Sequence, residues 1–225
     1  LREIDLLRSA AVAVGTGLRE VINYSFIPRN ALEKIRYNDA ASDEIIEVRK
    51  PITEDFVIMR PTLLYSLIKN AKDNINRNIT DIRFFETTKT FKRVEGKIEE
   101  EQKFGIILGG EPEKYIWNVK PVPYDFYDLK GIVEEIFSKI RFEKYTLVRT
   151  TKESYHPGRA ADVYVGKEYI GTFGELHPDV MEKKKKKKKL LTAELRLEAL
   201  IKYSDKNIFF MGINKFSAVA IDIAL

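Results

Sequence analysis

The chain has 225 residues, of which 44% are hydrophobic and 32% are charged, a balance typical of a soluble globular protein long enough to bury a core. It contains no cysteine, which excludes disulfides and cysteine-ligated zinc and fits a reducing compartment. No apolar run reaches the roughly 20 residues that a membrane-spanning helix needs, and the charged amino terminus is unlike a signal peptide, so we expect no membrane segment. Because the first residue is not methionine, we expect a fragment of a longer chain.

The first 17 residues are predicted to form a helix with apolar side chains on more than one face. The glycines of Gly15-Thr16-Gly17 suit its C-terminus, and its apolar residues include Leu6, Leu7, Ala10, Ala11, Val12, Ala13 and Val14. A surface helix needs only one apolar stripe, so the second apolar face is expected at a subunit interface, and the isolated chain could self-associate as a two-fold homodimer. Residues Leu18–Phe26 alternate as a strand does, and a short helix, Arg29–Arg36, follows.

The next stretch combines short strands with one longer helix. A strand is predicted at Glu44–Val48, and a helix is predicted from Pro61 to about Arg77, since proline suits the first helical position. Two apolar strands follow at Asp81–Phe91 and Phe104–Gly110, joined by a charged hairpin tip.

The second half begins with a helix from Asp125 to about Ile140, where an aspartate near the start suits N-capping and the helix dipole. A strand at Lys144–Thr150 precedes a turn at His156–Arg159, which contains proline and glycine. The last predicted elements are a hairpin, a strand and a helical turn, at Ala161–Val165, Tyr169–Phe173, Leu191–Leu195 and Glu198–Tyr203. This order predicts an α/β (α+β) fold with a mixed, mostly antiparallel sheet flanked by helices.

A run of seven lysines, Lys183–Lys189, accounts for the basic composition. The chain carries 39 basic and 34 acidic residues, a net charge of +5, and without the run the count is 39 − 7 = 32 against 34, a net charge of −2. We interpret the run as a solvated loop, and a basic tail for RNA phosphates is the alternative. The rest of the chain does not have the composition of a polybasic nucleic-acid-binding protein.

Four motifs together resemble those of the phenylalanyl-tRNA synthetase β-subunit family. The longest is Tyr155–Pro178, in which a Pro-Gly-Arg-Ala turn, a hairpin and an IGTFGELHP segment come in the family's order. The others are Arg60–Leu64 (RPTLL), Asp125–Gly131 (DFYDLKG) and Asn214–Leu225 (NKFSAVAIDIAL). The helix, glycine and strand at the start of the chain also resemble motif 1 of the class II aminoacyl-tRNA synthetases, which builds the subunit interface in that class.

The resemblance implies that residues 1–210 form a non-catalytic core domain similar to a class II catalytic domain, and that residues 211–225 open a C-terminal ferredoxin-like anticodon-binding domain. The chain would dock the catalytic α subunit in a cytoplasmic (αβ)₂ tetramer that uses ATP and magnesium to attach phenylalanine to its tRNA. The fragment alone would be inactive and without a cofactor, and tRNA would bind through the whole enzyme. Interface residues implied by motif 1 are Leu6, Leu7, Ala10, Val14, Arg19 and Tyr24.

The residues that could carry catalysis do not fit that role. Class II enzymes stabilise negative charge on ATP with one arginine from an fRxE strand and another from a glycine-rich motif 3. Here Arg83 stands three residues before Glu86, so the two side chains should point to opposite faces, and no glycine cluster with an arginine follows Glu194. We therefore predict no catalytic, cofactor-binding or metal site, and interpret His156 and His177 as turn residues.

Two other interpretations stay open. A catalytically competent class II ligase would need both missing arginines. A stand-alone RNA-binding or regulatory module derived from a class II synthetase would need a basic, aromatic face outside the lysine run. Arg159, in the Pro-Gly-Arg turn, is the most interesting single cation, and its two candidate roles are hydrogen bonding to neighbouring strand ends and contact with RNA or the α subunit.

Overall fold

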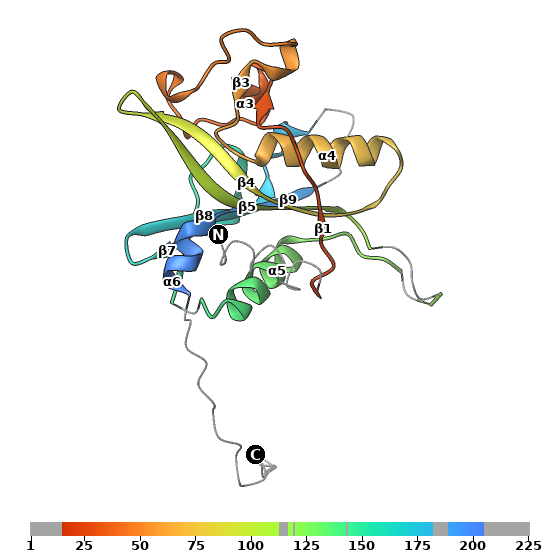
Figure 1. Ribbon diagram of the computed structural model, residues 1–225. Coiled ribbons are helices and arrows are strands. Elements are labelled where there is room, and N and C mark those ends of the chain that lie inside the picture. The colour runs from red at the N-terminus through yellow and green to blue at the C-terminus, as the bar shows by residue number, and fades with distance from the viewer. Residues whose placement is uncertain (1–14, 113–116, 119, 143, 182–188, 205–225) are drawn as a thin grey trace, which may run out of the picture.

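The structure is a computed structural model that describes residues 15–112, 117–118, 120–142, 144–181 and 189–204. Leu6, Leu7, Ala10 and Val14 lie outside these ranges, as do residues 183–188 of the lysine run and residues 205–225. The described chain has an α+β fold built on a mixed, mostly antiparallel sheet of seven strands, as predicted (Figure 1). None of the helices in these ranges combines the length and apolar character needed to cross a membrane.

The sheet has the order β1-β4-β5-β9-β8-β7-β6. Its strands are β1 (Arg19–Glu20), β4 (Asp81–Val94), β5 (Lys97–Gly110), β9 (Leu190–Arg196), β8 (Glu168–Leu176), β7 (Tyr155–Val165) and β6 (Thr146–Arg149). The β1–β4 pair is parallel, and the other neighbouring strands are antiparallel. Beside this sheet, β2 (Phe26–Ile27) pairs with β3 (Ile58–Met59). Two tight hairpins, β4–β5 and β7–β8, therefore form most of the sheet.

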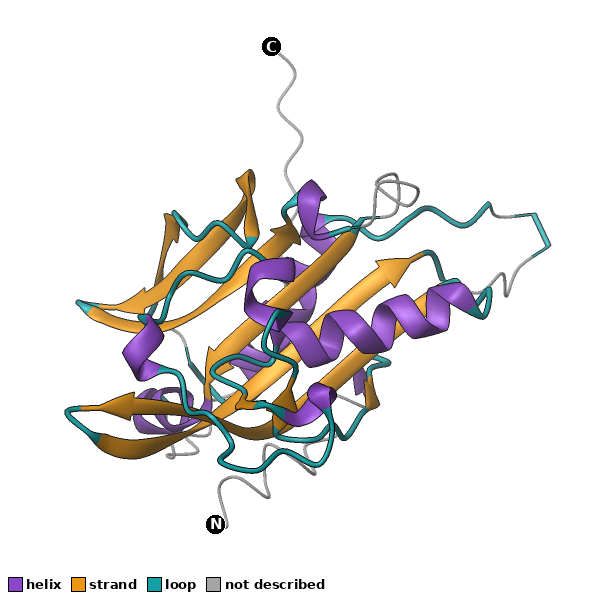
Figure 2. Ribbon diagram, turned by 90° about the horizontal axis from the view of Figure 1, so that it is seen from above, coloured by secondary structure: helices purple, strands orange, loops and turns teal. Residues whose placement is uncertain are grey.

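Helices cover both faces of the sheet. α4 (Leu64–Asn76) packs on one face, and α5 (Phe126–Lys139) with α6 (Leu197–Tyr203) packs on the other (Figure 1). Figure 2 shows α4 lying over its face, near the short helix α3 (Ala31–Lys34) and the β2–β3 pair. Asp125 caps α5 through a reciprocal capping box with Asp128, which confirms the predicted helix start.

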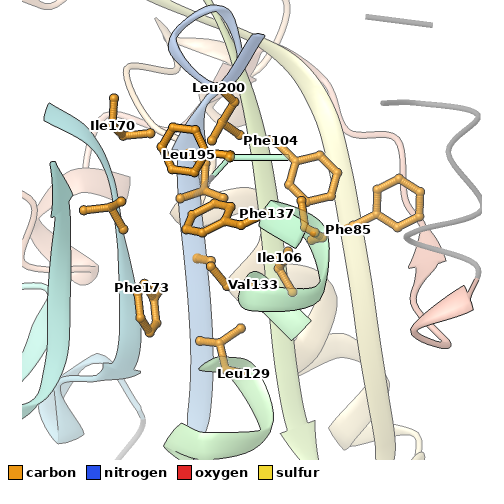
Figure 3. Close-up of a cluster of buried hydrophobic side chains, with 14 of the residues drawn as sticks. Phe85, Phe104, Ile106, Leu129, Val133, Phe137, Ile170, Phe173, Leu195 and Leu200 are labelled. Atoms are coloured by element: carbon orange, nitrogen blue, oxygen red, sulfur yellow. The ribbon is translucent and has the colours of Figure 1, made fainter. Parts of the chain in front are cut away.

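The core is divided between the two faces by strict alternation along β5 and β9. Ile106, Leu108 and Leu195 point toward α5, where Phe137 and Phe173 complete the cluster seen in Figure 3. Ile107, between them in sequence, points toward α4. Gly105 makes room on the α4 face, because a Cβ there would lie 2.9 Å or less from methyl carbons of Leu63 and Leu67.

Four local predictions were wrong or incomplete. The helix expected from Pro61 begins at Leu64, so the proline precedes the helix and does not take its first position. Residues 18–26 are not one strand: β1 ends at Glu20, and the chain then leaves β4 and joins β3 at Phe26. The strand expected at Glu44–Val48 is reduced to a single bridge between Glu47 and Ile58, after a 3₁₀ turn. The expected turn at 156–159 lies inside β7, because a register shift between Tyr155 and Ala160 absorbs the proline and glycine.

Candidate functional site: a polar row across the sheet and an apolar edge

A row of polar positions crosses the α4 face of the sheet. Glu86 of β4 pairs with Gly105 of β5, which pairs with Glu194 of β9. Glu194 is next to Thr172 of β8, and Thr172 is next to Asp162 of β7. Residues that are directly opposite share a face, so the carboxylates of Glu86, Glu194 and Asp162 lie on one face of the sheet, with Glu194 at the start of α4.

Glu194 is held at the N-terminus of α4. Its Oε2 accepts hydrogen bonds from the hydroxyl of Thr62 at 2.6 Å and from the backbone N–H of Leu63 at 2.7 Å, and its Oε1 lies 2.6 Å from Lys103 Nζ. The Lys103 and Glu194 side chains are only 13% and 12% exposed. A helix N-terminus favours an anion, so the carboxylate of Glu194 fills the position where a bound anion would be stabilised.

The electrostatics of this pair follow from burial and attraction. Burial alone would raise the pKa of Glu194, but attraction to Lys103 and the bonds from Lys103, Thr62 and Leu63 outweigh it and hold the pKa below its usual range. Burial would lower the pKa of Lys103, yet Glu194 and Glu101 raise it above its usual range. Both groups are therefore charged at neutral pH.

This ion pair is expected to stabilise the fold across neutral pH and to lose its effect in acid. The pKa of Glu194 is lower in the folded chain, so its contribution is complete above the unfolded pKa of about 4.3 and disappears as pH falls through the folded value. Urea unfolding between pH 2 and 8 of the wild type and of Glu194→Gln should give curves that are far apart at pH 7 and converge in acid. A difference independent of pH would contradict the assignment of charge.

A cavity of about 440 Å³ opens beside this pair, under the distal half of the β4–β5 hairpin. Six carboxylates and four cations line it, and each of the four cations has an acidic partner. Lys103 pairs with Glu194, Lys152 with Asp39, Arg196 with Glu101 and Lys92 with Glu44. A net-negative cavity whose cations are already paired with carboxylates is poorly suited to bind a nucleoside triphosphate.

Arg83 and His177 lie as expected from sequence, whereas His156 lies in a strand. Arg83 donates to Asp81 at 2.8 Å, whereas Glu86 faces the other side of β4 and pairs with Arg60 at 3.0 Å. His156 accepts a hydrogen bond from the N–H of Gly158 at 3.1 Å inside β7, so it stabilises the irregular part of that strand and not the expected turn. His177 accepts one from the N–H of Asp179 at 3.2 Å and caps the 3₁₀ turn Pro178–Val180. Within the described ranges, no group of three or more His, Asp or Glu side chains could hold a metal ion.

The edge of the sheet next to β1 exposes apolar side chains. Ile22, Tyr24 and Phe26 are 85%, 72% and 38% exposed, and they alternate with inward-pointing neighbours to form one outward stripe, which we call the edge stripe. The Tyr24 ring packs edge-on against Phe56, at 5.2 Å between centroids. Arg19, the other described residue of the motif 1-like set, lies on the same edge with its side chain 52% exposed and 3.8 Å from Asp81.

Arg159 is engaged within the chain. Its Nε and a terminal nitrogen donate to the two carboxylate oxygens of Glu175, at 2.6 and 2.9 Å, a bidentate pair between β7 and β8. The Glu175 side chain is 7% exposed and the Arg159 side chain 45%. The hydrogen-bonding role expected for Arg159 is therefore present, and contact with RNA or with another subunit stays a prediction.

Sequence reasoning did not identify Arg60, Lys103 and Glu194 as members of one site. Each is a charged residue inside or beside an apolar segment, for example Glu194 within LLTAELRL. A charge in such a segment indicates that it is buried and paired, and the sequence offers no other sign of these pairs. Their partners come from distant segments, so the pairing itself is visible only in the folded chain.

Comparisons with known proteins match most of this chain to beta subunits of phenylalanine–tRNA ligase. The family described as "Phenylalanyl tRNA synthetase beta chain CLM domain" matches residues 3–197. The phenylalanine–tRNA ligase beta subunit of Fusobacterium nucleatum is 45% identical over 214 residues, which are 93% of this chain and 26% of that protein. The corresponding subunit of Moorella thermoacetica is 33% identical over 222 residues, 97% of this chain and 27% of that protein. The chain thus spans about a quarter of the length of these relatives.

Proposed function

This chain belongs to the phenylalanyl tRNA synthetase beta chain family, and from that premise we propose that it is the non-catalytic core domain of a phenylalanine–tRNA ligase β subunit, which docks the catalytic α subunit. In this proposal the domain resembles a class II synthetase domain. The α subunit binds ATP, magnesium and phenylalanine, and the whole (αβ)₂ enzyme binds tRNA.

The observation that carries the docking role is the edge stripe. Three large apolar side chains, Ile22, Tyr24 and Phe26, are exposed on the segment that leads from β1, the edge strand of the sheet, to the β2–β3 pair. An exposed apolar surface of this kind is typical of a protein–protein contact, and aromatic residues contribute most to such contacts. Arg19 and Tyr24, implied as interface residues by motif 1, both lie on this edge.

The polar row supports the non-catalytic part of the proposal. An ATP site needs cations aimed at the phosphates, but Lys103, Arg196 and Arg60 on this face are each bound to a carboxylate of the same chain. The Glu194 carboxylate itself occupies the anion-binding start of α4. Added phosphates would have to displace these pairs.

Replacing the edge stripe should weaken binding to the α subunit without unfolding the chain. We expect Ile22→Ser with Tyr24→Ser to reduce the affinity for a phenylalanine–tRNA ligase α subunit by about 30-fold or more, because buried aromatic anchors are worth about 2 kcal/mol or more each. Affinity is measured by calorimetry or surface plasmon resonance.

The matched control is Val148→Ser, which removes a 51% exposed apolar side chain from β6, at the opposite edge of the sheet. It should leave the affinity unchanged. Equal effects of the two changes, or no effect of the stripe variant, would refute docking through this edge.

A further inference from the structure

The segment that carries the edge stripe changes its hydrogen-bonding partner halfway along. The N–H of Val21 donates to Phe85 O of β4 at 2.8 Å, and Ser25 O then accepts from the N–H of Arg60 at 2.9 Å. In Figure 1 this segment (red) rises from the sheet edge beside β4 toward β3 and α3. Among the described residues, no backbone–backbone hydrogen bond holds Ile22, Asn23 or Tyr24 between those two points.

One side chain bridges this gap. Glu86 Oε1 accepts from the backbone N–H of Asn23 at 3.2 Å, and Glu86 Oε2 accepts from Asn23 Nδ2 at 2.8 Å. Both donors belong to Asn23, which stands between Ile22 and Tyr24, the two most exposed residues of the edge stripe. The hold on this part of the segment therefore comes from a carboxylate and not from the sheet.

The Glu86 carboxylate is itself fixed by a buried cation. Arg60, which is fully buried, donates to Glu86 Oε1 at 3.0 Å and to the Thr88 hydroxyl at 2.8 Å, and its Nε donates to Lys89 O at 3.3 Å. The Arg60 backbone meanwhile bonds Ser25 on one side and Phe91 on the other. A charged, multiply bonded pair in a dry environment has little freedom to move.

We propose that Glu86 is a positioning residue for subunit docking: through Asn23 it holds Ile22 and Tyr24 in the extended conformation that the partner recognises. This inference rests on the proposed function. We call the pair of hydrogen bonds from Asn23 to Glu86 the lock. A segment that is ordered before binding loses less conformational freedom on association, so the lock should raise the affinity for the partner although Glu86 does not touch it. Glu86, the glutamate of the segment that was compared with the fRxE strand, would then serve assembly.

The test disturbs the lock from the edge side, where Arg60 keeps its partner. Asn23→Asp is isosteric and sets a second carboxylate against Glu86 Oε2, so it replaces attraction by repulsion. We expect hydrogen exchange of the residue 23 amide, whose N–H bonds to Glu86, to become at least tenfold faster in the chain alone, and affinity for the α subunit to fall at least tenfold. Ser25→Ala, a neighbouring change in a residue that contributes its backbone oxygen, should alter neither.

A charge exchange separates positioning from general damage. In the double variant Asn23→Asp with Glu86→Gln, the amide and the carboxylate trade places, so exchange at residue 23 should become slower and affinity higher than in Asn23→Asp alone. Recovery is incomplete because Arg60 loses its close carboxylate, and urea unfolding measures that cost separately. If Asn23→Asp fails to fold, Asn23→Ala is measured in its place, with the same direction of change expected.

Each outcome decides between the two proposals. Unchanged exchange in Asn23→Asp overturns the lock, and faster exchange with wild-type affinity overturns its role in docking. The stripe variant reports on docking independently: if its affinity is that of wild type while exchange in Asn23→Asp is faster, the proposed docking edge is wrong although the lock exists, and positioning for docking falls with it.

Discussion

Replacing Glu194 by glutamine is expected to lower the free energy of unfolding by about 3 kcal/mol, the lower end of the range for breaking a buried ion pair. Glutamine keeps the shape and can still accept from Leu63 or Thr62, but it leaves Lys103 without its close carboxylate. Glu101, 3.6 Å from Lys103 Nζ, compensates in part, which is why the lower end of the range applies.

Urea unfolding at pH 7 measures this effect, and Glu99→Gln is the control. Glu99 lines the same cavity but is exposed, so the same chemical change should cost less than about 0.5 kcal/mol. A loss below 1 kcal/mol in Glu194→Gln would mean that water or another group replaces the carboxylate, and would remove the argument that this face is filled from within.

Gly110→Ala should be the more severe of the two changes, with a loss of about 4 kcal/mol or failure to fold. Gly110 ends β5 with φ +78°, a backbone conformation that costs other residues of order 1 kcal/mol or more. A Cβ there would also lie 1.7 Å from the backbone oxygen of Thr80, so the start of β4 would have to move away from β5. That movement would break the bond from the N–H of Glu111 to Thr80 O.

Gly96→Ala supplies an unusually close control for this prediction. Gly96, at the tip of the β4–β5 hairpin, has the same φ of +78°, but nothing lies within 4 Å of the added Cβ. It should therefore show only the cost of backbone strain, about 1 kcal/mol. Thermal or urea unfolding of both variants isolates the clash, and equal losses would show that β4 can shift at no cost.

The parts of the fold that sequence predicted well depend on neighbours along the chain. The α5 helix begins where Asp125 can cap it, and the capping box closes within four residues. The opposite orientation of Arg83 and Glu86 follows from the two-residue repeat of a strand, and the structure confirms it. Both predictions need no knowledge of distant contacts.

The parts that sequence did not predict depend on which distant segment is the partner. Alternation over residues 18–26 indicates an extended segment, but it does not tell that β4 supplies the first hydrogen bonds and that β3 supplies the last ones. The polar row needs Glu86 and Glu194 to reach one face from strands far apart in sequence. A single sequence shows that these charges lie in apolar segments, and it does not show what neutralises them.

The central place of β9 has a consequence for how the chain is made. The β4–β5 hairpin and the β6–β7–β8 group can each form from segments close in sequence, which is fast, but they join only through β9, the last strand of the described chain. During synthesis the sheet would remain in two halves until Leu190–Arg196 leaves the ribosome. Until then the inner edges of β5 and β8 stay open to pairing with another nascent chain. These two strands, buried in the finished molecule, are the ones that a chaperone would have most reason to cover.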